Sequence, residues 1–137
     1  MKATLCHKSH FNAAYRHHNP HWSEAQNLEV FGEQGETLIF EGHNYNLEIK
    51  LSGEINPRTG KVYDKHKLAH LVKTHIEKRY DHQNLYLDMD DFKDTVPTVE
   101  MMSYRIWHIL RPLIEENIAL KVLIHESPQN YAEYEGD

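Results

Sequence analysis

The alternation of apolar and polar residues is clearest between residues 44 and 52. This period of two is typical of a strand with one buried face. The apolar row is Tyr45, Leu47, Ile49 and Leu51, and the polar row is Asn44, Asn46, Glu48, Lys50 and Ser52. A second apolar row, formed by Leu120, Val122 and Ile124, predicts another strand. Residues 2–16 are also predicted as a strand, although their alternation is weaker.

Two segments between these strands have the spacing of amphipathic helices. Asp64 is a good N-cap for the first helix, which we expect to end near Tyr80. Thr98 is the expected cap of the second helix, and Pro112 should end or kink it. Strand, strand, helix, helix, strand is the order of an α+β fold, with helices packed on an antiparallel sheet.

Length and composition limit the classes of partner. The 137 residues fit one domain, 1–137. A net charge of -6 without a basic stripe argues against a nucleic-acid partner. No apolar run reaches the ~18 residues of a membrane span, so no membrane partner is expected. The single cysteine, Cys6, excludes an internal disulfide and favours a cytoplasmic location.

The chain has twelve histidines, and five of them lie in the first 21 residues. A metal site is one interpretation, and solvated surface histidines are the more common outcome. The predicted loop 17–40 that follows is long for a compact domain, and such loops are usually functional.

Glu126 continues the apolar row of the last predicted strand. A carboxylate on a buried face is costly unless a partner meets it. One interpretation is a strand end where the side chain reaches water. The other is a carboxylate that accepts two parallel N–H bonds from a planar heterocycle such as a guanine-like ring.

Two short motifs carry residue types that do chemistry. The dipeptide Asp81-His82 suits proton transfer near neutral pH, because an aspartate can orient a histidine and raise its basicity. Alone, it is more often a pair of surface residues. In Glu41-x-His43 two metal-ligand types lie on one strand face. Tyr15 or His17 would supply the third ligand that a usable site needs.

Five segments, taken in order, resemble the 6-pyruvoyltetrahydropterin synthase and 6-carboxytetrahydropterin synthase family. They are HFNAAYR at 10–16, EGHNYNLEIKLSGEINPRTGKVYD at 41–64, YDHQNL at 80–85, PTVEMMSYRIW at 97–107 and VLIHES at 122–127. The resemblance covers essentially the whole chain, and its order and spacing make chance similarity improbable.

The resemblance implies a T-fold, which is an antiparallel four-stranded sheet with two helices on one face. Three subunits would close their sheets into a barrel, and two rings would stack into a homo-hexamer with sites between subunits. It further implies a pterin substrate. Glu126 would anchor the pterin ring with help from Thr98, and Asp81 and His82 would transfer protons.

The chain departs from the family at its metal ligands. The family holds zinc with three histidines, and their positions here are Tyr15, Glu41 and His43. This oxygen-rich set would bind zinc less well than three imidazoles and suits iron or manganese better.

The chain also departs from the family at the nucleophile. The family's catalytic cysteine belongs in the loop before Glu41, where this sequence has none. A subgroup of the family has glutamate in its place, and Gly35-Glu36-Thr37-Leu38 resembles that pattern with Ile39-Phe40 inserted. By this resemblance Glu36 is the general base.

Three functions follow from the resemblance. The first is a metal-dependent pterin lyase that acts on dihydroneopterin triphosphate. The second is cleavage of the dihydroneopterin side chain to 6-hydroxymethyl-dihydropterin. The third is a pterin-binding paralogue without catalysis. Arg16, Lys65 and Lys67 are the candidate groups for a triphosphate. The sequence leaves open whether the product serves queuosine, folate or biopterin synthesis.

Overall fold

The computed structural model describes residues 1–15, 19, 21–32, 41–85 and 89–137. For Tyr15 and Glu41 it describes the backbone alone. None of the helices in these ranges is long and apolar enough to cross a membrane.

The centre of the fold is a five-stranded sheet in the order β3-β1-β2-β4-β5. Its strands are β1 (Lys2–Tyr15), β2 (Glu41–Glu54), β3 (Gln83–Asn84), β4 (Ala119–His125) and β5 (Tyr131–Tyr134). Four of them pair antiparallel, and β3 pairs parallel with β1, so the sheet is mixed. The sequence predicted β1, β2 and β4 from its periodicity, and the family resemblance implied four antiparallel strands. The sequence missed β3 because a strand of two residues has no detectable period.

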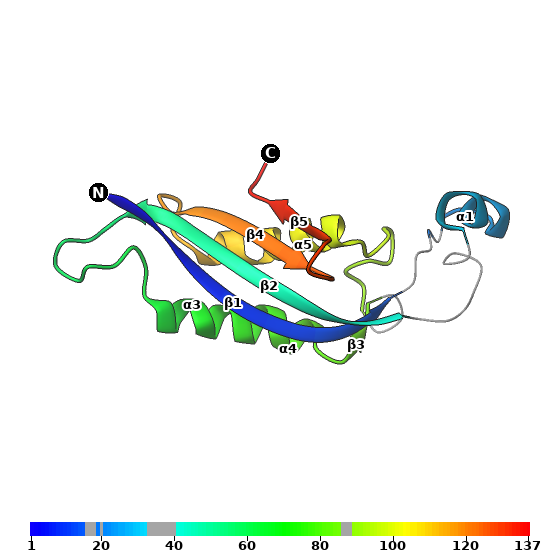
Figure 1. Ribbon diagram of the computed structural model, residues 1–137, viewed down its shortest axis with the longest axis horizontal. Coiled ribbons are helices and arrows are strands. Elements are labelled where there is room, and N and C mark those ends of the chain that lie inside the picture. Colours follow the sequence, from blue (N-terminus) through cyan, green and yellow to red (C-terminus); the bar gives the residue numbers. More distant parts are fainter. Residues whose placement is uncertain (16–18, 20, 33–40, 86–88) are drawn as a thin grey trace.

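Two helical segments run beside the sheet (Figure 1). The first consists of α3 (Lys65–Val72), η1 (Lys73–Glu77) and α4 (Lys78–Tyr80) without interruption. The second is α5 (Val99–Leu110), and the 3-10 turn η2 (Arg111–Leu113) follows it at Pro112. Asp64 caps the first helix by accepting hydrogen bonds from the backbone N–H groups of His66 and Lys67. The predicted boundaries near Asp64 and Tyr80 are therefore confirmed.

Both helical segments pack on one face of the sheet and form a single core. Tyr45, Leu47, Ile49 and Leu51 of β2 are fully buried, which confirms the alternation in the sequence. The helices supply Leu68, Val72, Ile76 and Tyr80 from one side and Met102, Ile106 and Leu110 from the other, and the strands supply Phe11, Tyr45, Leu47, Ile49, Leu51, Leu120, Val122 and Ile124. The predicted α+β layering is thus correct.

The opposite face of the sheet is polar and carries cross-strand contacts. The Glu48 carboxylate on β2 lies 3.2 Å from His125 Nε2 on β4 and 3.6 Å from the Lys8 ammonium on β1. Burial tends to raise the pKa of Glu48, but the contacts with His125 and Lys8 outweigh it and leave that pKa below its usual range. Charged and polar side chains thus cover this part of the face, where no helix packs.

A further helix, α1 (Glu24–Phe31), lies within the segment that was predicted as a loop. Figure 1 shows it beyond the end of the sheet where β3 lies. Ser23 and Gln26 form a capping box at its start, and the Trp22 and Phe31 rings stack at 5.9 Å. The loop prediction was wrong here. Most side chains of α1 are exposed, so the sequence has no helical period of apolar residues in this segment.

Candidate functional site

One end of the β1–β2 ladder brings together the segments that carry the candidate chemistry. On one side Ala13 of β1 pairs with His43 of β2. On its other side Ala13 pairs with Gln83 of β3, directly after Asp81-His82. Thirty to seventy residues separate these segments in the sequence, and the sheet makes them neighbours.

Asp81 and His82 are held against β1 by hydrogen bonds with the backbone of Asn12. The Asn12 N–H donates to Asp81 Oδ1 at 2.8 Å, and the His82 N–H donates to the Asn12 carbonyl at 2.6 Å. The second carboxylate oxygen of Asp81 lies 3.5 Å from His82 Nε2. The imidazole is 81% exposed, so it is open to a ligand on the surface. The expected aspartate–histidine pair therefore exists as a contact.

The backbone of His82 has a left-handed conformation, with φ at 60°. It is the one non-glycine residue with positive φ in the described part of the chain. Such a conformation costs about 1–3 kcal/mol and is often found at functional sites. The hydrogen bond to Asn12 and the pairing of β3 offset this cost.

The three expected metal-ligand positions are neighbours in the β1–β2 register. Tyr15 pairs with Glu41, and the next pair on the same side of the ladder is Ala13 with His43. The His43 side chain is half-buried, and its ring lies 5.7 Å from the ring of Tyr45. Among residues with described side chains, no group of three His, Cys, Asp or Glu is placed to hold a metal ion.

Glu126 and Thr98 come from the other half of the fold. Glu126 directly follows β4, is half-buried, and its N–H donates to the Asn130 carbonyl at 3.2 Å. Thr98 caps α5 by accepting a hydrogen bond from the Met101 N–H at 3.2 Å. The capping role predicted for Thr98 is confirmed, and its role toward a pterin stays a prediction.

Some predicted residues are not at this end of the sheet or lie outside the description. Glu36, Arg16 and His17 fall among the residues that are not described. Lys65 and Lys67 begin the first helical segment, and Tyr80 ends it, so about 20 Å of helix separates them from Asp81. Lys67 instead lies 3.3 Å from Glu115.

The chain is similar to known proteins over nearly its whole length. The family model described as 6-pyruvoyl tetrahydropterin synthase matches residues 4–137. The chain is 39% identical to the 6-pyruvoyl tetrahydrobiopterin synthase of Drosophila melanogaster over 135 residues, which are 98% of this chain and 80% of that protein. The chain belongs to the 6-pyruvoyl tetrahydropterin synthase family. The members of this family are pterin lyases.

Solved structures support the membership. The synthase of Caenorhabditis elegans has a TM-score of 0.91 and 34% identity, with 100% of this chain and 97% of that chain covered. A variant of the Plasmodium vivax synthase, whose catalytic glutamate is replaced by cysteine, has a TM-score of 0.70 and 21% identity, with 98% and 97% covered. At that identity the second match shows the fold alone.

Thr98 offers a direct test of how α5 begins. In Thr98→Ala the Met101 N–H loses its acceptor, so the free energy of unfolding should fall by about 1 kcal/mol. Urea denaturation measures this difference. Thr98→Ser keeps the hydroxyl and should retain most of the stability. Equal stability of the alanine variant and the parent would contradict the capping role.

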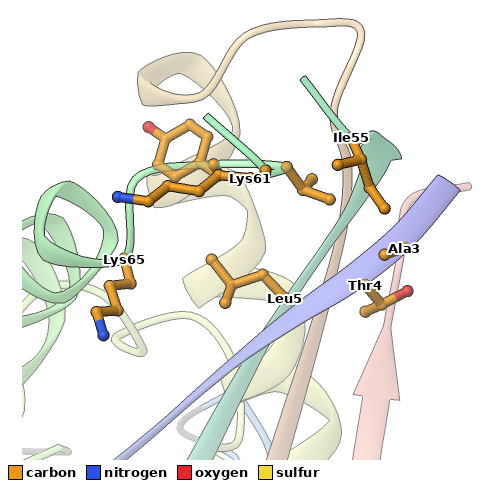
Figure 2. A pocket seen from close by; sticks show the side chains of 9 residues that line it. Ala3, Thr4, Leu5, Ile55, Lys61 and Lys65 are labelled. Carbon is orange, nitrogen blue, oxygen red and sulfur yellow. The ribbon is translucent and has the colours of Figure 1, made fainter. Parts of the chain in front are cut away.

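A hollow at the far end of the sheet is separate from Asp81 and His82. It has a volume of about 270 Å³ and is lined by Ala3, Thr4, Leu5, Ile55, Gly60, Lys61, Val62, Tyr63 and Lys65. Figure 2 shows the ammonium groups of Lys61 and Lys65 apart from each other. Leu5 and Asn12 are seven residues apart on β1, which is about 23 Å of strand. The hollow therefore does not belong with Asp81 and His82.

An ion pair next to Asp81 was not predicted. Asp91, whose side chain is 6% exposed, accepts hydrogen bonds at both carboxylate oxygens from Arg79. The Tyr80 hydroxyl donates to Asp91 Oδ2 at 2.7 Å. No sequence period links residues 79, 80 and 91, because the chain leaves the helix at Tyr80 and forms β3 before it reaches Asp91.

Hydrogen bonding decides the charge state of Asp91. Burial alone would raise the pKa of its carboxyl, but the bonds from Arg79 and Tyr80 outweigh burial and lower that pKa. A carboxyl whose pKa is lowered by folding stabilises the fold at pH values above its pKa in the unfolded chain, which is about 4. This stabilisation is lost as the pH falls through the pKa in the folded protein. Asp91 is thus ionised and paired at neutral pH.

Proposed function

We propose that this protein is a pterin lyase that acts on dihydroneopterin triphosphate with an altered metal site. The observation that carries the proposal is the contact between Asp81 and His82 at the end of β1 where Tyr15, Glu41 and His43 are neighbours in register. Family membership supports the reaction class, and this geometry supports the site.

His82 is the proton-transfer group in this proposal. Its imidazole is exposed, and Asp81 lies beside one of its nitrogens, so a proton taken from a side-chain carbon of the pterin can be held there. The electrons left on carbon then expel the triphosphate as the carbon–oxygen bond breaks. Asp81, fixed by the Asn12 N–H, stabilises the imidazolium that forms.

Glu126 is the proposed anchor of the pterin ring, with Thr98 as its helper. A carboxylate can accept two parallel hydrogen bonds from the amino group and the adjacent ring N–H of a pterin. The half-burial of Glu126 supports this role, because reduced contact with water strengthens such bonds. Glu126 would then hold the pterin ring while the three-carbon side chain of the pterin contacts His82.

Tyr15, Glu41 and His43 are the proposed metal ligands. The pairing of Tyr15 with Glu41 and of Ala13 with His43 supports one shared site. A phenolate, a carboxylate and an imidazole suit iron or manganese better than zinc. A bound metal would make the side-chain oxygens and neighbouring C–H groups of the pterin more acidic.

A second function is favoured by the motif Gly35-Glu36-Thr37-Leu38. With Glu36 as general base, the protein would cut the dihydroneopterin side chain to 6-hydroxymethyl-dihydropterin. Glu36→Ala should then abolish the activity. This function uses the same Asp81–His82 pair and differs from the first in the bond that breaks.

The proposed assembly is a cytoplasmic homo-hexamer with sites between subunits. Within the described residues, residues 2–11 of β1 lack a strand partner on the side away from β2, and β5 lacks one on the side away from β4. Strand edges of this kind present unpaired N–H and C=O groups to another chain. Three copies joined through these edges would close a barrel, and two barrels would stack.

Mass spectrometry of the products tests the proposal. Purified protein is incubated with dihydroneopterin triphosphate and with zinc, iron or manganese in turn. Loss of triphosphate supports the first function, and formation of 6-hydroxymethyl-dihydropterin supports the second. Unchanged substrate with every metal, together with measurable pterin binding, would instead identify a binding paralogue without catalysis.

A further inference from the structure

We propose that Asp91 is a positioning residue that holds the Asp81–His82 pair against β1. The inference rests on the proposed role of that pair in proton transfer. Asp91 itself does not reach the pair. It acts through Arg79 and Tyr80, the two residues that directly precede Asp81 in the chain.

The first step of the argument is how completely Asp91 is engaged. Arg79 binds its carboxylate in a bidentate manner, with Nε at 2.9 Å from Oδ2 and Nη2 at 2.5 Å from Oδ1. The Tyr80 hydroxyl binds the same Oδ2 at 2.7 Å. Charge-assisted bidentate pairs restrict geometry more than single bonds do. The last residues of α4 are therefore fixed in orientation as well as in position.

The second step is that Asp91 is itself fixed to the rest of the fold. The Arg105 guanidinium on α5 donates to the Asp91 backbone carbonyl at 3.0 Å. The fully buried Tyr80 ring lies 6.2 Å from the Phe92 ring and 5.6 Å from the Phe11 ring on β1. These contacts thus connect α4, α5 and β1 at the end of α4, directly before Asp81.

The third step is that the Asp81–His82 backbone needs support from this side. Asp81 leaves the helix in an extended conformation, and His82 follows with φ at 60°, which is unfavourable for a residue with a Cβ. On the downstream side the pair is held by β3, which has two residues. The hydrogen bonds with Asn12 and the short strand β3 hold the pair on the β1 side, and the anchor at Asp91 fixes the helix end from which the pair leaves.

Arg111 provides a matched control for an ordinary stabilising role. Its guanidinium donates to the carbonyls of Ile114, Glu115 and Ile118, so it also makes several hydrogen bonds. It is the first residue of η2, directly after α5, and these hydrogen bonds involve neither Asp81 nor His82. Arg111→Met should therefore lower global stability without moving the pair.

The first test is amide hydrogen exchange at His82, whose N–H is bonded to the Asn12 carbonyl. The parent, Asp91→Asn and Arg111→Met are compared at a pH where all three are folded. In Asp91→Asn we expect exchange at His82 to accelerate about tenfold or more, because charged hydrogen bonds that restrain local opening are lost. Arg111→Met should leave it within about twofold. Equal acceleration in both variants, or none in Asp91→Asn, overturns the proposal.

Kinetics provides the second test. If the pair is displaced, kcat for the product identified by mass spectrometry should fall in Asp91→Asn while KM stays near that of the parent, since the pterin anchor Glu126 lies elsewhere. Arg111→Met should keep both values. A KM effect alone contradicts a positioning role. The exchange test needs no substrate, so it decides on Asp91 even if no turnover is found.

A milder variant covers the case in which Asp91→Asn does not fold. Tyr80→Phe keeps the buried ring against Phe11 and Phe92 and removes only the hydroxyl that binds Asp91. It should accelerate exchange at His82 in the same direction, by a smaller factor. A folded Tyr80→Phe variant with unchanged exchange and unchanged kcat would count against the proposal.

Discussion

Replacement of His82 by asparagine should lower turnover by about 10²- to 10⁴-fold, the usual contribution of a positioned acid–base group. Asparagine suits this test because it tolerates the left-handed backbone that His82 adopts, with φ at 60°, yet cannot take up a proton near neutral pH. The side chain is 81% exposed, so little packing is lost. Product formation by mass spectrometry gives the rate, and urea denaturation verifies the fold.

His70→Asn is the matched control for this result. His70 is also exposed, but it lies in the first half of the helical segment, away from the β3 end of the sheet. This variant should keep the activity of the parent. Activity of His82→Asn within about threefold of the parent would remove His82 from the mechanism and favour Glu36 or another group as the proton acceptor.

Replacement of Glu126 by glutamine should weaken pterin binding about 100-fold. The glutamine amide keeps the shape of the carboxylate but turns one acceptor into a donor, which would face an N–H group of the ring. Loss of a charged hydrogen bond costs about 1.5–3 kcal/mol, and each 1.4 kcal/mol is tenfold in affinity. Calorimetric titration with dihydroneopterin measures the change without any need for turnover.

Glu133→Gln is the companion variant for Glu126. Glu133 lies on β5, and its carboxylate is 3.2 Å from the Lys121 ammonium, so it is a glutamate with an ion-pair partner of its own. Its replacement should leave pterin affinity unchanged. If both variants bind like the parent, Glu126 is a strand-end residue facing water, which was the other interpretation of the sequence.

The parts of the fold with a regular period were predictable from the sequence. The alternation of apolar residues predicted β2, and the caps Asp64 and Thr98 predicted where the helices begin. Both signals depend on residues that are close together in the chain. The strand β5 and the helix α1 were missed. Both are short, and their side chains are mostly exposed, so neither leaves the burial pattern that a period requires.

The candidate site was predictable in its residue types and not in its geometry. Asp81 and His82 were recognised from a dipeptide in the context of the family. Their contacts with Asn12 join residues 69 apart in the chain, and such pairing leaves no local trace. Asp91 was missed for the same reason, since its bond with Tyr80 joins residues 11 apart that share no helix or strand.

The pairing of Tyr15 with Glu41 has a consequence for how this family can change over time. Tyr15 and Glu41 form the last pair of the β1–β2 ladder. Both ends of the segment 16–40 are therefore attached to the same point of the sheet. The entropy of closing a chain segment grows only slowly with its length, so an insertion of two residues between these strands would add little cost. Substitutions and length changes in this segment can therefore accumulate while the framework of the site stays intact. A residue that acts as a new general base can therefore arise in this segment while the sheet keeps its structure.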